Sequence, residues 1–161
     1  MNSVCHKILL HKCSKLNIDS FWFQDYLSNR TQSVRINKTV SKTATLSYGV
    51  PQGSILGPIL FTIYVNDMSK EVSNCVLVQY ADDTQLLHTG TIDDVNTLIK
   101  NTESSLCQLK TYFHRNGLMI NADKTQCIFI GTRQLMVKVQ DNYVIKFDGK
   151  NITPCKQVKQ N

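Results

Sequence analysis

The sequence predicts an α+β fold, in which mostly antiparallel strands form a sheet and the helices group on one of its faces. Apolar residues recur at helical spacing in the stretches 4–28 and 91–115. In the stretches 31–48 and 75–88, apolar residues alternate with polar ones or form short runs around a turn, which is typical of strand pairs. No convincing linker separates these patterns, and we expect a single domain.

Composition narrows the class of partner. The 161 residues include 18 Lys and Arg against 12 Asp and Glu, which gives a net charge of +6. This excess favours an anionic partner such as nucleic acid. An ordinary basic protein is the alternative.

Cysteine spacing and hydropathy indicate the cellular compartment of the protein. The six cysteines contain no C-x-x-C pair, which argues against a zinc site or a redox motif and favours reduced thiols. The start of the chain carries only the short apolar patch Ile8–Leu10, and no run reaches membrane-spanning length. We therefore expect an intracellular protein, cytoplasmic or nuclear, with no signal peptide, transmembrane segment or membrane partner.

The first part of the chain predicts two helices and two strands. A break near Asn17–Asp19 divides the helical pattern of 4–28 into two short helices. Beyond them the period changes to two, which predicts strands over 33–36 and 43–48 joined by the polar segment at Asn37–Lys38.

The middle of the chain predicts a loop, a buried helix and a hairpin. Gly49–Ser54 is rich in Gly and Pro, and the apolar run 59–65 follows it. Gly57–Pro58 suits the first helical turn, because Pro lacks only a donor that would stay unpaired there. Short apolar runs on either side of Tyr80–Asp83 predict a hairpin over 75–88.

The last part predicts a long helix and a second hairpin. Thr91–Asp94 carries a T-x-x-D capping signature, and Gly117 suits the end of the helix. Short extended segments are expected at 118–120 and 127–130. Asp148–Gly149 predicts a type I′ turn.

Two adjacent carboxylates mark the candidate chemistry. A tight hairpin turn is usually Asn-Gly or Asp-Gly, because Gly accepts positive φ, whereas Asp82 and Asp83 place like charges side by side. A bound divalent cation removes this conflict. Mg²⁺ is usually held by one or two carboxylates together with substrate phosphates. A solvated acidic turn is the alternative.

Two motifs, in matching order and spacing, resemble the reverse transcriptases of non-LTR (LINE-type, jockey-like) retrotransposons. The first is Gly49–Phe61, which contains Pro-Gln-Gly, and the second is Tyr80–Thr84. Further matches lie at Tyr26–Arg30 and within 116–125, so the resemblance runs from about 4 to 131. It implies an RNA-directed DNA polymerase of a mobile element.

The resemblance implies a right-hand polymerase palm, a ferredoxin-like antiparallel sheet with helices on one face. It also implies transfer of a nucleotidyl group from a dNTP to a primer 3′ hydroxyl, with two Mg²⁺ or Mn²⁺ ions in the complete site. Asp82 and Asp83 match its catalytic metal ligands, with Asp82 the stronger candidate for direct ligation.

The same resemblance assigns roles to other residues. The positions that match the dNTP pocket are Pro51, Gln52, Gly53 and Tyr80. A solvated loop amide is the alternative for Gln52, and a core position is the alternative for Tyr80. Lys124 matches a catalytic lysine that neutralises or protonates leaving phosphate oxygens, with a salt-bridged surface lysine as the alternative.

Four basic residues near the first strand pair are candidates for contacts with template phosphates, which hold a strand without reading its sequence. They are Arg30, Arg35, Lys38 and Lys42. A solvated face is the alternative. The implied partners are an RNA template and a DNA primer.

By this resemblance the chain is a single partial domain over 1–161, with a palm core at about 4–131 and the start of a truncated hairpin region at 132–161. The family's third carboxylate would lie upstream of Met1, and fingers and thumb are missing. Because Mg²⁺ demands near-ideal octahedral oxygen geometry, we expect no polymerase activity from this chain alone. A non-catalytic nucleic-acid-binding relic and an inert truncated product are the alternatives.

Overall fold

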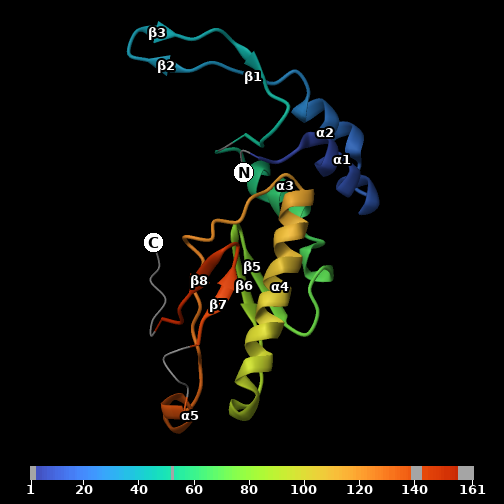
Figure 1. Cartoon of the computed structure of the whole chain (residues 1–161). Coiled ribbons are helices and arrows are strands. Elements are labelled where there is room, and N and C mark those ends of the chain that lie inside the picture. Colours follow the sequence, from blue (N-terminus) through green and yellow to red (C-terminus); the bar gives the residue numbers. More distant parts are fainter. Residues whose placement is uncertain (1–2, 52, 139–142, 156–161) are drawn as a thin grey trace. The chain divides into compact units, whose positions relative to one another are not determined.

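The computed structural model describes residues 3–51, 53–138 and 143–155. Helices and strand pairs follow one another along these residues, which confirms the predicted α+β class (Figure 1). The strands form two-stranded antiparallel sheets: β1 with β4, β2 with β3, β5 with β6, and β7 with β8. The antiparallel pairing is therefore as predicted, while the described strands stay in separate pairs.

The chain divides into two compact units. The first lies within Met1–Asp67 and Arg115–Leu118, and the second within Met68–His114 and Met119–Asn161. The single domain over 1–161 stays a prediction.

The first unit begins with two helices, α1 at His6–Lys15 and α2 at Ser20–Leu27, which confirms the predicted pair. Between them Asn17 takes a φ of 55°, a left-handed conformation that Asn tolerates better than most residues. The Asp19 carboxylate then accepts a hydrogen bond from Phe21 N at 2.9 Å and caps α2. The predicted break is thus made by two local effects of polar residues.

The predicted buried helix is α3, Leu56–Val65, with Pro58 in its first turn. Its buried face completes a core to which α1 and the end of α2 also contribute. The buried residues of this core are Val4, Leu9, Cys13, Leu27, Val50, Leu60, Phe61, Tyr64 and Val65.

Tyr64 is the polar centre of that core. Its fully buried hydroxyl donates to Asn116 O at 2.5 Å and accepts from Cys5 N at 3.3 Å. Burial raises the pKa of this hydroxyl, which keeps it protonated. The buried Lys12 ammonium donates to Tyr64 O and to the Asp67 carboxylate, each at 2.6 Å. These bonds tie α1, α3 and the residues after the long helix together.

An exposed two-stranded arm, residues 31–45, leaves the core between α2 and α3 (Figure 1). Its strands are β1 at Thr31–Gln32, β2 at Arg35–Ile36, β3 at Thr39–Val40 and β4 at Ala44–Thr45. The turn lies at Asn37, as predicted, but the expected strand 43–48 was wrong in its bounds. Pairing starts already at Thr39 and ends at Thr45. Because every strand residue is exposed, no buried face fixed these bounds in the sequence.

The second unit packs the long helix α4, Val95–Arg115, against two hairpins. The first pairs β5, Val76–Tyr80, with β6, Asp83–Leu87; the second pairs β7, Ile145–Phe147, with β8, Lys150–Ile152. Leu109 and Tyr112 of α4 cluster with Leu77 of the first hairpin, and Ile99 and Leu106 pack against the buried face of the second. One apolar stripe of α4 therefore serves both hairpins.

The second hairpin has the predicted turn. Asp148 and Gly149 take φ values of 51° and 74°, and two successive positive φ values are what a type I′ turn requires. The segments 118–120 and 127–130, expected to be extended strands, join no ladder. Short helices were not predicted at Met68–Lys70 (η1) and Arg133–Lys138 (α5).

The start of α4 corrects a second expectation. Thr91 makes no side-chain capping bond; Asp94 N donates instead to Thr91 O at 3.2 Å and closes the 3-10 turn η2, Ile92–Asp94. The α-helix proper begins at Val95. Across the residues that the structure describes, no helix is long and apolar enough to cross a membrane.

We expect Tyr64→Phe to lower the free energy of unfolding by about 1–3 kcal/mol, because it removes a buried hydroxyl that bonds both Cys5 N and Asn116 O. Urea unfolding followed by circular dichroism measures this. Tyr48→Phe is the matched control: it removes the same hydroxyl from a side chain that is 59% exposed, and its effect should stay within about 0.5 kcal/mol. Equal losses in both variants would contradict the role of Tyr64.

Candidate active site

The predicted carboxylate pair lies at the tip of the β5–β6 hairpin. Tyr80 pairs with Asp83 across the hairpin, so Ala81 and Asp82 form its two-residue turn. Ala81 takes a φ of 52°, at the first central position, where the type II′ turn usually has Gly. A side chain in this left-handed region costs about 1–2 kcal/mol. The turn thus holds a strained residue immediately before the two carboxylates.

Both carboxylates are exposed, and no other described residue forms a hydrogen bond or an ion pair with either of them. In the described ranges, no group of three or more His, Cys, Asp or Glu side chains could hold a metal ion. Asp82 and Asp83 nevertheless fit a hard cation, since Mg²⁺ prefers oxygen ligands and commonly takes one or two carboxylates with substrate phosphates. The two carboxylates are therefore candidate ligands for such an ion.

Tyr80 is 83% exposed, so the core alternative for this residue is wrong. It lies beside the carboxylates on the same hairpin, opposite Asp83. The structure therefore brings Tyr80, Asp82 and Asp83 together, as the sequence pattern predicts.

Lys124 is exposed in a turn, where its backbone N donates to Asn121 O at 3.1 Å. No ion pair joins its ammonium to either hairpin carboxylate, and the neighbouring Asp123 pairs with Lys150 instead. Within the described part of the chain, Lys124 thus forms no salt bridge. Its catalytic role stays a prediction.

The Pro-Gln-Gly loop belongs to the first unit. Gln52 lies outside the described residues. Ser54 Oγ donates to Pro51 O at 2.8 Å and accepts from Gly57 N at 3.0 Å, which folds the loop back on the start of α3. A Cβ at Gly57 would lie 2.9 Å from Pro51 O, so only Gly fits there. Gly53 has open space around it and is required by its φ of 78° instead.

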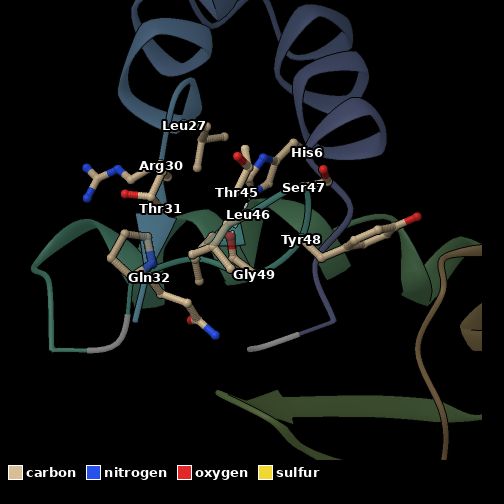
Figure 2. Close-up of a pocket in the computed structure, with 12 residues that line it drawn as sticks. His6, Leu27, Arg30, Thr31, Gln32, Thr45, Leu46, Ser47, Tyr48 and Gly49 are labelled. Carbon is tan, nitrogen blue, oxygen red and sulfur yellow. Dashed lines mark hydrogen bonds between the residues drawn. The ribbon is translucent and has the colours of Figure 1, made fainter. Parts of the chain in front are cut away.

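Next to this loop lies a cavity of about 770 Å³ that the sequence did not indicate (Figure 2). Its wall is formed by the base of the arm, by Gly49–Pro51 and by His6. His6 Nε2 donates to Gly49 O at 2.7 Å and so fixes the start of the loop. A contact between residues 43 apart in the sequence leaves no local pattern, so the sequence does not indicate this role of His6.

The four basic candidates are arranged in two ways. Arg30 is partly buried, with its Nε donating to Tyr26 O at 2.8 Å. Arg35, Lys38 and Lys42 are exposed on the arm. Between Asp25 and Asp67 the sequence has no Asp or Glu, so these four are the only charged side chains of that stretch. The arm is therefore purely cationic.

Comparison with known proteins shows the family. A model of the family described as "Reverse transcriptase (RNA-dependent DNA polymerase)" matches residues 2–156.

The chain belongs to the reverse transcriptase family.

Several of its curated relatives come from mobile elements of Drosophila melanogaster. This reverse transcriptase chain is 29% identical to the "Probable RNA-directed DNA polymerase from transposon BS" over 131 residues, 76% of the chain and 14% of the relative. It is 31% identical to the RNA-directed DNA polymerase from mobile element jockey over 93 residues, 52% of the chain and 10% of the relative. The resemblance to non-LTR, jockey-like reverse transcriptases is thereby confirmed.

A third relative is the "Probable RNA-directed DNA polymerase from transposon X-element" of Drosophila melanogaster, 39% identical over 64 residues, 37% of the chain and 7% of the relative. The reverse transcriptase chain thus spans 14% or less of the length of these curated relatives.

The strain at the hairpin turn is testable. We expect Ala81→Gly to raise the free energy of unfolding of the second unit by about 1 kcal/mol, because Gly accepts the φ of 52° without a Cβ clash. Thermal unfolding measures it. Ala44→Gly, in the exposed strand β4, is the control and should stabilise nothing. A destabilising Ala81→Gly would mean that this turn is not strained.

Proposed function

We propose that this chain supplies the palm segment of an RNA-directed DNA polymerase of a mobile element, with Asp82 and Asp83 as metal ligands. The observation that carries the proposal is the exposed, unpaired carboxylate pair at the tip of the β5–β6 hairpin. Membership of the reverse transcriptase family supports it. So does the packing of α4 against this hairpin, which suits a palm in which helices cover one face of a ferredoxin-like sheet.

The proposed reaction is a nucleotidyl transfer. The primer 3′ hydroxyl oxygen attacks the α-phosphorus of a dNTP in line; the new P–O bond forms as the bond to pyrophosphate breaks, and the hydroxyl proton passes to solvent. Two Mg²⁺ or Mn²⁺ ions would lower the pKa of the attacking hydroxyl and steady the pyrophosphate oxygens. Asp82 and Asp83 would hold the ions, Asp82 by direct ligation. Lys124 neutralises leaving phosphate oxygens.

In this proposal the dNTP lies against Pro51, Gln52, Gly53 and Tyr80. Gly53 adds no side chain and has open space around it, which suits close approach of a sugar or base to the backbone. The exposed Tyr80 ring offers a flat surface beside the carboxylates. A planar phenol there suits the end of the primer or the incoming nucleotide.

The partners in this proposal are an RNA template and a DNA primer. Arg30 and the three cations of the arm contact template phosphates. A cationic stretch without acidic residues attracts a polyanion whatever the nucleotide sequence.

The cysteines bear on the compartment in which the protein acts. The six cysteines are free thiols, and burial raises the pKa of the Cys13 and Cys127 thiols, which keeps them protonated and unreactive. Such thiols suit a reducing compartment, the cytoplasm or the nucleus. The chain acts as one partial domain over 1–161, with the palm core at about 4–131.

We expect the chain to bind Mn²⁺ weakly at the hairpin, and Asp82→Asn or Asp83→Asn to weaken that binding by about tenfold or more, since each removes one of two protein ligands. Electron paramagnetic resonance of free Mn²⁺ measures the binding. Asp93→Asn is the matched control, because Asp93 and Asp94 are also adjacent carboxylates but lie on η2. An equal loss in Asp93→Asn would show mere charge attraction.

We also expect the purified chain not to extend a DNA primer on an RNA template by itself, because two carboxylates leave the octahedral coordination of two ions incomplete. Incorporation of labelled dNTP measures this. Extension that is abolished by Asp82→Asn would contradict the expectation and would establish the chain as a complete polymerase.

The arm predicts a salt dependence. Replacing Arg35, Lys38 and Lys42 together by Ala should weaken RNA binding and flatten the slope of log affinity against log salt by about 2, at about 0.7 per phosphate contact. Anisotropy of a labelled single-stranded RNA measures it. A control triple, Lys15→Ala, Lys70→Ala and Lys100→Ala, removes the same charge from exposed positions off the arm. Equal slopes for both triples would refute the arm as the contact.

A further inference from the structure

Three planar side chains stack beside the arm at four-residue spacing. The Trp22 and Tyr26 rings are nearly parallel, at 4°, with centroids 5.6 Å apart. The Arg30 guanidinium carbon lies 4.4 Å from the Tyr26 ring centroid. A spacing of four residues brings side chains over one another on a helix, and α2 carries the first two of them. We call Trp22, Tyr26 and Arg30 the stacked column.

The column is held in place by its surroundings. Arg30 Nε donates to Tyr26 O at 2.8 Å, and Tyr26 packs against the core of the first unit. Phe23 meets the Trp22 ring edge-on, with centroids 5.2 Å apart and planes at 86°. Trp22 nevertheless stays 53% exposed. The column therefore presents an ordered indole ring to solvent, so that binding a flat group there costs little further ordering.

The charges around the column select the kind of partner. Arg30 belongs both to the column and to the wall of the cavity near the Pro-Gln-Gly loop (Figure 2). From Arg30 to Lys42 the chain carries four cations and no acid. A flat apolar ring beside a row of cations complements a polymer that combines flat bases with phosphates. Single-stranded nucleic acid has this chemistry, because its bases are free to stack on aromatic rings.

We infer that the stacked column binds an unpaired base of a single-stranded nucleic acid on Trp22, while the arm contacts neighbouring phosphates. This inference rests on the proposed function, since it names how the first unit holds the strand that the polymerase handles. Stacking tolerates any base and does not read the 2′ hydroxyl, so RNA and DNA single strands both qualify.

Trp22 is the single tryptophan of the chain, so its fluorescence reports this contact directly. We expect an oligouridylate of about 12 nucleotides, within the usual length of such sites, to quench that fluorescence saturably at low salt. Trp22→Leu should lower the affinity by about 5- to 150-fold, as the loss of one base stack predicts. Anisotropy of the labelled oligomer measures the affinity of the variant. An oligothymidylate should bind with similar affinity, because stacking does not read the 2′ hydroxyl.

Two controls keep the test decisive. Phe21→Leu changes a neighbouring aromatic ring that is 79% exposed but outside the column, and it should leave the affinity within about twofold. An abasic oligomer keeps the phosphates and lacks the bases, so it should bind the wild-type chain less tightly than oligouridylate and without quenching. This comparison needs no substitution, so it decides even if Trp22→Leu fails to fold.

The outcomes separate this inference from the proposed function. Tight binding without quenching, or equal affinity for the abasic oligomer, overturns the stacked column as a base platform and leaves the arm's phosphate contacts standing. No binding of any oligomer at low salt overturns both. The Mn²⁺ site at Asp82 is measured independently and is unaffected by either result.

Discussion

The buried Tyr64 side chain is the constraint on which the first unit depends. Its hydroxyl joins backbone groups 59 and 52 residues away in the sequence. A buried polar group without a partner costs about 1–3 kcal/mol, so these segments must come together for any of them to be stable. The same core also positions the Pro-Gln-Gly loop, because Gly49 N donates to O of the buried core residue Val4 at 2.7 Å. A structural hydrogen bond thus sets where the Pro-Gln-Gly loop begins.

The residues proposed as metal ligands are exposed and lie outside the packed core. Asp82 and Asp83 are exposed at the tip of a two-stranded hairpin, directly after the strained Ala81. A substitution there that relieved strain or repulsion would favour the fold at the expense of the site. This opposition between stability and local geometry is typical of functional positions. The exposed, acid-free arm follows the same pattern, since it buries nothing that would stabilise it.

Local chemistry made several features predictable. Asn17 and Asp19 break the first helical stretch, Asp148–Gly149 builds a type I′ turn, and apolar runs around Asp82 build the hairpin. The capping bond predicted from the T-x-x-D signature at Thr91 was wrong. Asp94 N can bond either the side chain or the backbone carbonyl of Thr91, and here it donates to the carbonyl. The bounds of the arm failed because no buried face fixed its register.

By itself, the sequence determined the α+β class, the family and the order of the two motifs, since periodicity, turn chemistry and short motifs are all local properties of the chain. Only the tertiary structure decided which side chains are exposed and which meet across long separations. It showed Tyr80 to be exposed, bonded His6 to Gly49, gave Lys124 no ion pair with the described carboxylates and stacked Arg30 on Tyr26. The physical reason is that burial and long-range hydrogen bonds depend on packing between segments, which leaves no pattern within any one of them.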